Sequence, residues 1–426
     1  MNQRPYGPVG ATSIFIMNRS RPTSGPLKLA AVSLMLIALV AAQNAGADAA
    51  FLKWIQDFYP SAAQAGITKF TFDTVFTGID APDPAVLKAA RYQPEFVAQV
   101  WDYMDSRITE GAVRLGKAMA RDYKKWLDVI ETRYGVDREF LLAIWSMESS
   151  YGAALREGSV LRNVARSLAT LAYADDKRRK FAREQLIAAM RIVQNGDVIA
   201  ADLRGSWAGA MGHTQFIPTS YLTWAVDIDG DGKRNVWTSP PDALASAANL
   251  LHRNGWQTGK TWGYEVRLPQ DIDYSLVNKE GISLGQWSAI GVQRIAGTPF
   301  PRPDDKAILK LPGGATGPAF LMLKNFYVLK RYNNADKYAL AVGHLADRLK
   351  GYGPFVQAWP RGYRPLKEDE RKEVQTRLAQ LGLYAGEIDG NIGSASRAAI
   401  QAYQKGVGLV PDGFASQSLL DKIRGP

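Results

Sequence analysis

The sequence contains no cysteine, and this absence removes several ways of stabilising a protein or building an active site. Disulfide bonds, zinc–thiolate sites and iron–sulfur clusters are excluded, and so is a lipid anchor attached to a cysteine. Histidine is scarce as well, with only His213, His252 and His344. Because these three are far apart in the sequence, we do not expect a metal site built from several histidines.

The longest hydrophobic run lies near the N-terminus and is too short to span a membrane comfortably. Basic residues up to Lys28 precede this run, Leu29–Ala42, and Ala45-Gly46-Ala47 offers a small-x-small cleavage site. We therefore predict that residues 1–47 form a secretory signal peptide and that Met17 is the true start. A retained anchor helix is the alternative.

The chain also lacks any long block of lysine and arginine, although its formal net charge is +11. The predicted leader contains four basic residues and no acid, so its removal lowers the net charge to +7. Nucleic acid is the usual partner to consider for a basic protein, but the export signal argues against it. We predict a periplasmic protein with an anionic partner such as a cell-wall polymer, and no nucleic acid.

Apolar residues at helical spacing dominate residues 48–350, so we expect a mainly α (α+β) domain there. Two short alternating segments, Glu265–Leu268 and Ile308–Leu311, predict a small β insertion within it. The expected helices cover residues 95–103, 112–134, 137–148, 168–173, 181–193, 243–253, 319–331 and 335–350.

A second domain is expected after a linker at residues 351–365, which is rich in glycine and proline. Residues 366–426 are predicted to form three short helices joined by glycine-rich turns. In the first of these helices, Val374, Leu378 and Leu381 follow helical spacing. Three helices of this length bury only a marginal core.

The segment Ala143–Gly152 places a carboxylate, Glu148, at the end of an apolar helical run. Glu148 shares a helix face with Leu141 and with Ile144 or Trp145. Burial against apolar neighbours raises the pKa of a carboxyl group, so Glu148 can hold a proton at neutral pH and act as a general acid. An exposed glutamate that ends an ordinary helix is the alternative, and this segment alone does not decide between the two interpretations.

A second segment, Ser206–Tyr221, combines small residues with hydrogen-bonding and aromatic side chains. Its glycines and alanines would let the backbone approach a ligand closely. Polar groups such as Gln215 offer hydrogen bonds, and Trp207 and Phe216 offer flat faces for sugar rings. A tight packing corner explains the same composition, so this segment alone is ambiguous.

Together, the two segments resemble the lytic murein transglycosylases of the membrane-bound lytic transglycosylase B family. Two motifs carry the resemblance: Glu148-Ser-Ser-Tyr-Gly, and later Gly209-Ala-Met-Gly-x-x-Gln-Phe-x-Pro-x-Ser-Tyr. It spans most of residues 50–350 and includes Arg331-Tyr332-Asn333-Asn334 near the end of the domain. The resemblance implies a lysozyme-like helical catalytic domain with Glu148 as its only acid/base. The residues that it implies for the glycan cleft are Tyr103, Ser206, Gln215, Tyr332, Asn333 and Tyr338. His213 falls at a variable position of the motif and is expected to be structural.

The reaction implied by the resemblance is cleavage of peptidoglycan without water. Protonated Glu148 would donate to the oxygen of the β-1,4 bond between N-acetylmuramic acid and N-acetylglucosamine. The resulting carboxylate would then take the proton of the muramic C6 hydroxyl as that hydroxyl attacks C1, which forms a 1,6-anhydro sugar. Ordinary glycosidases need two carboxylates, and a hydrolase that uses a second acid such as Glu157 is the enzyme alternative. The other alternative is a wall-binding scaffold without catalytic activity.

Acidic residues at alternating positions from Asp227 follow the first part of a calcium-binding loop. Thr238 stands where such a loop ends in glutamate, so Asp242 is expected to close the site, as it does in the related family. The expected ligands are Asp227, Asp229, Asp231, the backbone carbonyl of Lys233, and Asp242. We expect a structural calcium ion and no cofactor for the chemistry, with a metal-free turn as the alternative.

Residues 366–426 resemble the three-helix peptidoglycan-binding domain of many wall enzymes. The residues that carry this second resemblance include Val374-Gln375, Ile388-Asp389-Gly390, Tyr403-Gln404 and Asp412-Gly413. It implies that the domain as a whole binds peptidoglycan glycan strands, with a structural appendage as the alternative. We expect a monomer, and the sequence leaves open whether wall-remodelling proteins also bind.

Overall fold

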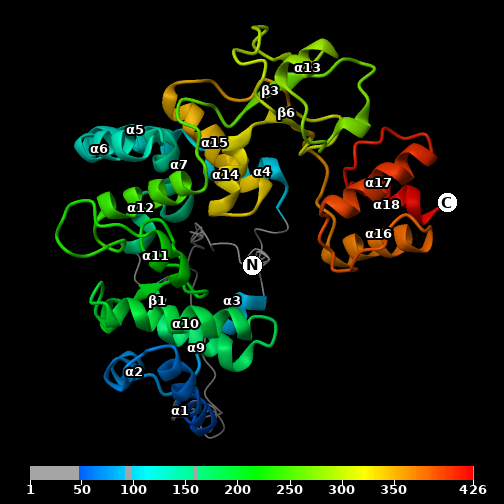
Figure 1. The fold of residues 1–426 in the computed structure, drawn as a ribbon. Coiled ribbons are helices and arrows are strands. Elements are labelled where there is room, and N and C mark those ends of the chain that lie inside the picture. Colours follow the sequence, from blue (N-terminus) through cyan, green and yellow to red (C-terminus); the bar gives the residue numbers. More distant parts are fainter. Residues whose placement is uncertain (1–47, 92–97, 157–160, 426) are drawn as a thin grey trace, which may run out of the picture. The chain divides into compact units, whose positions relative to one another are not determined.

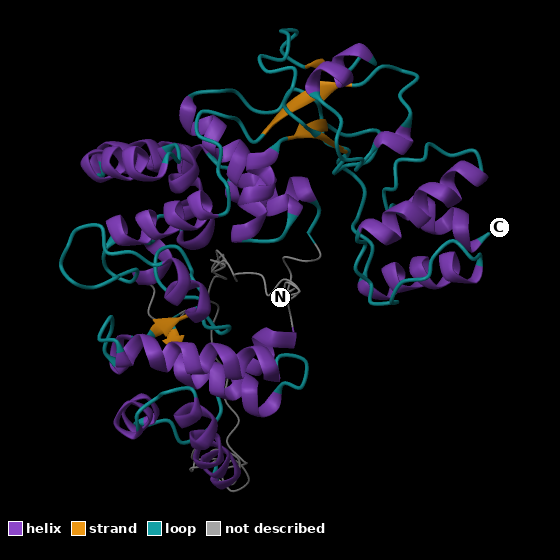
Figure 2. Cartoon of the chain, viewed as in Figure 1, coloured by secondary structure: helices purple, strands orange, loops and turns teal. Residues whose placement is uncertain are grey.

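The computed structural model describes residues 48–91, 98–156 and 161–425 (Figure 1). The predicted leader, the start of the predicted helix at 95–103, and Glu157 lie outside these residues. Helices supply most of the regular structure and strands only short segments, which confirms the mainly α fold class (Figure 2). No helix within the described ranges is long and apolar enough to cross a membrane.

The chain divides into two compact units. We call the described residues 48–91 and 148–246 the Glu148 unit, and the described residues 98–147 and 247–425 the sheet unit. Two helices belong to both. The chain passes from one unit to the other after Met147 within α7 (Arg138–Ser149), and after Ser246 within α12 (Pro240–Arg253).

The Glu148 unit is built around two consecutive helices, α9 and α10, which pack against each other more extensively than any other pair of described helices. Nearly every residue of α9 is buried, and Asn163 caps its start by accepting a hydrogen bond from the Arg166 N–H at 2.9 Å. A two-stranded antiparallel sheet, β1 with β2, lies beside this pair. The unit's own elements are α1 (Ala49–Gln64), α2 (Lys69–Phe76), α3 (Pro84–Arg91), α8 (Ala153–Arg156), β1 (Arg162–Asn163), α9 (Val164–Ala174), α10 (Arg179–Gln194), η2 (Ala200–Asp202), β2 (Arg204–Gly205) and α11 (Pro218–Trp224).

The sheet unit contains a four-stranded antiparallel sheet in the order β4-β3-β6-β5, within which Gly263 pairs with Met322. Its separate core includes the buried side chains of Leu284, Trp287 and Leu309. The elements of the main body are α4 (Val100–Arg107), α5 (Glu110–Asp122), α6 (Lys124–Tyr134), β3 (Gly263–Arg267), η3 (Tyr274–Leu276), α13 (Leu284–Ala289), β4 (Gln293–Arg294), β5 (Ile308–Lys310), β6 (Ala319–Met322), α14 (Lys324–Tyr332) and α15 (Asp336–Lys350).

The predicted β insertion is confirmed, but the helix predicted over residues 319–331 is wrong at its start. Ala319–Met322 forms the strand β6, and the helix α14 begins only at Lys324. All four residues of β6 are buried, and the strand pairs with β3 on one side and β5 on the other. A short, continuously apolar run has no periodicity that separates a buried strand from a buried helix. The helix predicted over 112–134 is likewise two helices, α5 and α6, which meet at Tyr123.

Residues 351–365, predicted as a linker, contact the main body of the sheet unit along much of their length. The Phe355 ring stacks on His344 with 3.8 Å between ring centroids. Next to it, the Val356 and Gln357 N–H groups donate to the Glu265 carboxylate at 2.9 and 2.7 Å. The Trp359 ring packs near the Trp101 ring, with 6.0 Å between the ring centroids. This segment is therefore bound to the body of the sheet unit.

The three predicted C-terminal helices are present as α16 (Glu368–Gln380), α17 (Ser394–Gly406) and α18 (Gln417–Arg424). Val374 and Leu378 are fully buried, whereas Leu381 is 55% exposed because α16 ends before it. A buried amide holds the first turn: Gln375 accepts a hydrogen bond from the Gly390 N–H at 2.7 Å and donates to Asp389 at 3.1 Å. The polar motif residues thus fix turns of the domain.

A tight contact in the sheet unit makes the packing testable. A Cβ atom added at Gly343 of α15 would lie 2.6 Å from the buried Trp262 ring. We expect Gly343→Ala to lower the free energy of unfolding by about 1–3 kcal/mol, because the ring has no room to move. Gly111→Ala in α5 is the control, since its Cβ would meet nothing closer than 3.5 Å. Denaturant unfolding measures both, and equal stabilities would contradict the described packing.

Candidate active site

Glu148 lies near the end of α7 and is 1% exposed. The residues that precede it, including Leu141, Ile144 and Trp145, are buried as well. The predicted apolar helix face is therefore present, and the alternative of an exposed glutamate is excluded. A carboxyl group in such surroundings is stripped of water, and loss of water disfavours its charged form.

The backbone directly after Glu148 is held in an unusual conformation. Ser150, Tyr151 and Gly152 have consecutive φ angles of 50°, 56° and 82°. A side chain in this left-handed region costs about 1–2 kcal/mol per residue. The Ser149 hydroxyl compensates by accepting a hydrogen bond from the Gly152 N–H at 3.1 Å and donating to the His213 carbonyl at 2.7 Å. The turn after the glutamate is thus tied to the glycine-rich segment.

Ser206 closes the first turn of the glycine-rich segment. Its hydroxyl accepts hydrogen bonds from the Ala208 and Ala210 N–H groups at 3.3 and 3.0 Å, and its own N–H donates to the Ala210 carbonyl at 2.8 Å. Further along, the Met211 N–H donates to the Phe216 carbonyl at 2.9 Å. The segment is therefore a rigid double turn, and Ser206 supports it from within.

Gln215 occupies a strained position in this double turn, with a φ angle of 50° and 2% exposure. Its amide N–H₂ donates to the Gly212 carbonyl at 2.8 Å. Its amide oxygen is buried and accepts no hydrogen bond from the described residues. An unsatisfied buried acceptor costs about 1–3 kcal/mol, so this oxygen is suited to an N–H donor brought by a ligand.

The glycines of this segment serve the protein's own packing. A Cβ at Gly212, where φ is 69°, would lie 2.2 Å from the Val236 carbonyl oxygen, and one at Gly209 would lie 2.9 Å from Leu168. The aromatic rings of Trp207 and Phe216 are buried at 8% and 2% exposure, so the expectation that they offer open faces to sugars is wrong. The packing-corner alternative therefore holds for these residues, although the buried amide oxygen of Gln215 accepts no hydrogen bond from the described residues.

The remaining predicted cleft residues lie in the sheet unit, where they form an aromatic and basic cluster. The rings of Tyr332 and Tyr338 stack with 6.3 Å between centroids and an interplanar angle of 5°. The Tyr103 ring has two cations over it, Lys337 and Arg107, each 5.6 Å from the centroid. Half-buried Asn333 is the C-terminal cap residue of α14 and directly follows Tyr332, the last residue of that helix.

Two residues of this cluster were not anticipated from the sequence. Arg107 donates to the Met147 carbonyl at 3.3 Å and so holds the residue that directly precedes Glu148. Lys337 donates to the Ala98 carbonyl at 3.3 Å, which joins α15 to the start of α4. The sequence could have pointed to both residues, because Arg107 lies one helical turn after Tyr103 and Lys337 is adjacent to Tyr338.

His213 has no acid–base role in this arrangement. Burial and the nearby Arg156 lower its pKa to about 4. A histidine with that pKa is neutral at physiological pH and is a poor proton donor. The backbone N–H of His213 donates to the Val236 carbonyl at 2.9 Å, in keeping with the structural role expected for this residue.

The four predicted acidic metal ligands come together in the Glu148 unit. One oxygen from each of Asp227, Asp229, Asp231 and Asp242 lies within 4.8 Å of the others. Asp242 is fully buried, and its two oxygens accept hydrogen bonds from the Ile228 and Asn235 N–H groups at 2.9 and 2.8 Å. Burial, despite these two bonds, raises its pKa to about 6.

This donor set suits a hard cation. Calcium prefers carboxylate and carbonyl oxygens, and the loop presents four carboxylates without any nitrogen or sulfur ligand. Gly230 and Gly232 have φ angles of 80° and 86°, which allow the loop to fold tightly around its acids. Lys233 follows Asp231 in the turn and donates its N–H to the Asp231 carboxylate at 2.8 Å. Clustered carboxylates repel one another, and a bound cation relieves that repulsion.

The architecture defines the class of protein. A helical body with a buried glutamate at the end of an apolar helix, a rigid glycine-rich double turn, a small sheet and a C-terminal three-helix domain is a lysozyme-like fold. The described elements therefore confirm the fold class predicted from the sequence. The comparisons with known proteins identify the family.

The chain belongs to the transglycosylase SLT domain family, whose model matches residues 50–347. A second model, described as a putative peptidoglycan binding domain, matches residues 367–423. The resemblances described from the sequence motifs are thereby confirmed.

Three similar proteins illustrate the relationship. Membrane-bound lytic murein transglycosylase B of Escherichia coli (strain K12) is 30% identical over 252 residues, which span 58% of this chain and 66%, just under two thirds, of that protein. SltB3 from Pseudomonas aeruginosa, in complex with NAG-anhNAM-pentapeptide, is 47% identical with a TM-score of 0.84, covering 88% of this chain and 99% of that one. The Escherichia coli lytic transglycosylase Slt35 in complex with calcium is 25% identical with a TM-score of 0.58, covering 70% and 92%.

The rigidity of the glycine-rich segment can be tested by adding one methyl group. Gly212→Ala combines a left-handed backbone with a Cβ 2.2 Å from a carbonyl oxygen. We expect it to lower the free energy of unfolding by about 2–5 kcal/mol, which is the sum of strain and overpacking. Gly196→Ala is the matched control, because its φ is 81° but nothing lies within 4 Å of the added Cβ. If thermal unfolding gives the same loss for both variants, close packing at Gly212 is not the cause.

Proposed function

We propose that this protein cleaves the β-1,4 bond between N-acetylmuramic acid and N-acetylglucosamine in peptidoglycan and leaves 1,6-anhydromuramyl ends. The observation that carries the proposal is Glu148, a buried carboxylate followed by a strained and hydrogen-bonded turn. Membership of the transglycosylase family supports the proposal. The anhydro sugar named in the SltB3 complex supports the class of product.

The mechanism needs one carboxyl group in two protonation states. In the first step, the neutral form of the buried Glu148 donates a proton to the glycosidic oxygen as the bond to C1 breaks. The carboxylate that results accepts the proton of the C6 hydroxyl of the same muramic residue. The hydroxyl oxygen forms the new bond to C1, so no water is consumed. A single acid/base is sufficient because the nucleophile belongs to the substrate, and no cofactor is required.

We assign roles to the other predicted cleft residues by the groups that they present. The amide oxygen of Gln215, which accepts no hydrogen bond from the described residues, accepts the N–H of a substrate N-acetyl group. Half-buried Tyr332 contacts a sugar ring, whereas Tyr338 and Tyr103, at 2% and 8% exposure, are buried parts of the same cluster. Asn333 orients the sugar by hydrogen bonds. Ser206 holds the double turn in place. Fixing substrate groups near the reacting atoms is itself a large part of catalysis.

We further propose how the chain is organised around this activity. Residues 1–47 are the export signal, 48–350 the catalytic domain, 351–365 a connecting segment and 366–426 a wall-binding domain. The match of residues 367–423 to a peptidoglycan-binding model supports the last assignment. The protein then acts outside the cytoplasm, in the periplasm, as a monomer. Its partner is peptidoglycan and not nucleic acid.

We also propose that calcium binds at Asp227, Asp229, Asp231, Asp242 and the Lys233 carbonyl, and that its role is structural. The close carboxylates and the buried Asp242 support this proposal. The relative Slt35 has been crystallised in complex with calcium. Bound calcium would join the loop to the start of α12, where Asp242 lies.

Replacing Glu148 tests the acid/base role. We expect Glu148→Gln to reduce cleavage of purified peptidoglycan by a factor of about 10²–10⁴, because the amide neither donates nor accepts the proton. Binding to sacculi is expected to persist. Glu139→Gln is the matched control, since Glu139 is a half-buried glutamate in the first turn of the same helix. Residual activity equal to that of the control would remove Glu148 from its role.

The products distinguish the proposed reaction from its alternatives in the same assay. Mass spectrometry of the fragments is expected to show anhydro ends, which are lighter than reducing ends by one water. Reducing ends would instead indicate a hydrolase with a second carboxylate such as Glu157. An intact protein that releases no fragments would indicate a binding scaffold.

Calcium binding is tested by thermal unfolding. Calcium at about 100 times its Kd is expected to stabilise the protein by about 2.7 kcal/mol and so to raise Tm, and a chelator should reverse the change. Asp242→Asn should abolish the calcium-dependent rise, because it removes the buried charge that closes the loop. Asp202→Asn, an exposed acid outside the cluster, should retain it. A calcium response that survives in Asp242→Asn would contradict the site.

A further inference from the structure

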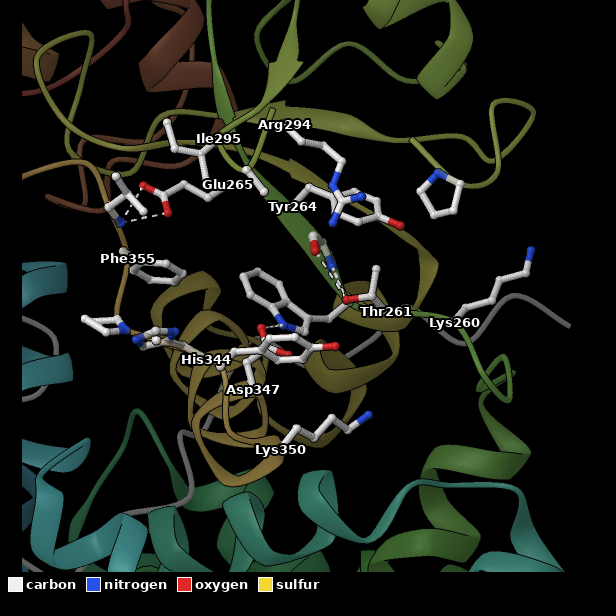
Figure 3. Close-up of a pocket in the computed structure, with 18 of the residues that line it drawn as sticks. Lys260, Thr261, Tyr264, Glu265, Arg294, Ile295, His344, Asp347, Lys350 and Phe355 are labelled. Carbon is white, nitrogen blue, oxygen red and sulfur yellow. Dashed lines mark hydrogen bonds between the residues drawn. The ribbon is translucent and has the colours of Figure 1, made fainter. Parts of the chain in front are cut away.

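The sheet unit contains a cavity of about 540 Å³ that the proposed chemistry does not use (Figure 3). Strand β3, the C-terminal half of α15 and the segment 352–356 line it. Its volume is within the range of about 300–1,000 Å³ that is usual for ligand sites. The buried Trp262 ring and the Phe355 ring, which is stacked on His344, supply apolar walls.

Two arginines that line this cavity, Arg294 and Arg302, form no ion pair with any described carboxylate. The Arg294 guanidinium lies 4.9 Å from the centre of the Tyr264 ring and donates to the Pro299 carbonyl at 3.1 Å (Figure 3). Arg302 donates to the Gly259 carbonyl. Within the described parts of the chain, neither guanidinium forms an ion pair with a carboxylate. Each is held in place by neutral groups and still carries its full charge.

The two lysines that line the cavity, unlike these arginines, form ion pairs with carboxylates. Lys260 pairs with Asp305 at 2.7 Å, and Lys350 pairs with Asp137. Their charges are therefore balanced within the protein. The contrast singles out Arg294 and Arg302 as the groups available to an anionic ligand.

The acids of the cavity do not balance the two arginines either. Glu265 is occupied by the N–H groups of Val356 and Gln357, as the dashed lines in Figure 3 show in part. Asp347 lies at the floor and accepts a hydrogen bond from the Trp262 indole N–H at 2.9 Å. Burial raises the pKa of Asp347 to about 6, so this carboxyl group carries a proton in a fraction of the molecules near neutral pH. A protonated carboxyl at the floor can donate to an amide carbonyl of a ligand.

We propose that this cavity binds a carboxylate of the peptidoglycan stem peptide through Arg294 and Arg302. The planar fork of a guanidinium matches a carboxylate in two parallel hydrogen bonds. In peptidoglycan the lactyl carboxyl group of the muramic sugar forms the amide bond to the stem peptide. The free carboxylates therefore lie on the stem peptide. The apolar walls suit the side chains of a short peptide. This inference rests on the proposed function for the identity of the polymer.

Titration calorimetry with a synthetic stem pentapeptide tests the proposal on the full-length Glu148→Gln protein, which excludes turnover. Arg294→Gln/Arg302→Gln is expected to weaken binding about tenfold or more, because hydrogen bonds to charged groups are lost. Converting the peptide's carboxylates to amides should weaken its binding to the parent protein by a similar factor. The same conversion should have little further effect on the double variant, since the groups that read the charge are already gone.

Two further variants separate a specific contact with the arginines from a general effect of positive charge. Arg267→Gln/Lys279→Gln removes the same charge from exposed positions outside the cavity, and its Kd should stay within about twofold of the parent value. Arg294→Lys keeps the charge without the fork and should give an intermediate Kd. Circular dichroism and Tm establish that each variant is folded.

The outcomes separate this inference from the proposed function. Equal peptide affinity in the parent and the Arg294/Arg302 variant would overturn the inference, as would the absence of saturable binding or equal affinity for the amidated peptide. In each of these cases, formation of anhydro products by the unmodified protein would still support the proposed function. If no cleavage occurs but the peptide binds as expected, the proposed function fails while the cavity remains a peptide site.

Discussion

The hydroxyl of Ser149 makes the interaction on which the proposed catalytic centre depends most. It accepts the N–H of Gly152 and donates to the carbonyl of His213, so one side chain satisfies the strained turn after Glu148 and anchors the glycine-rich segment. Without that bridge, the last of three consecutive left-handed residues would lose the side-chain hydrogen bond to its N–H group. The glycine-rich segment would likewise lose its attachment to the end of α7. The position of Glu148, the proposed proton donor, thus depends on a neighbour to which the proposal gives no part in the reaction.

The residues around this bridge divide into those that support and those that remain available. Ser206, Tyr221 and Phe216 are fully engaged, with the Tyr221 hydroxyl donating to the Arg234 carbonyl and Phe216 buried in the core. Gln215 differs, because its amide oxygen is buried and no described residue bonds to it. A protein tolerates such a group at a cost when a ligand completes it. This difference, more than residue type, supports the proposal that Gln215 contacts the substrate.

The sheet unit uses charge in two ways. Around Tyr103, the cations of Arg107 and Lys337 lie over an aromatic face, and Arg107 also holds the backbone beside Glu148. In the cavity beside β3, lysines are paired with acids, whereas Arg294 and Arg302 are positioned by neutral carbonyls. Both arrangements fix long basic side chains in place before any ligand arrives. Prior fixation of this kind reduces the entropy that binding must otherwise remove.

The sequence by itself determined the fold class, the acidic loop and the three C-terminal helices, because each depends on local periodicity or on motif spacing. It placed Glu148 on an apolar helix face, and only the structure decided that the carboxyl group is buried. Tertiary structure alone decided that Ala319–Met322 is a central strand, since only its neighbours β3 and β5 distinguish that apolar run from a helix. It also decided that Trp207 and Phe216 are core residues and that the predicted linker lies bound through Glu265. The unpaired arginines of the cavity belong to the same group. Spacing along a chain shows which residues share a face, but burial and pairing depend on partners far away in sequence.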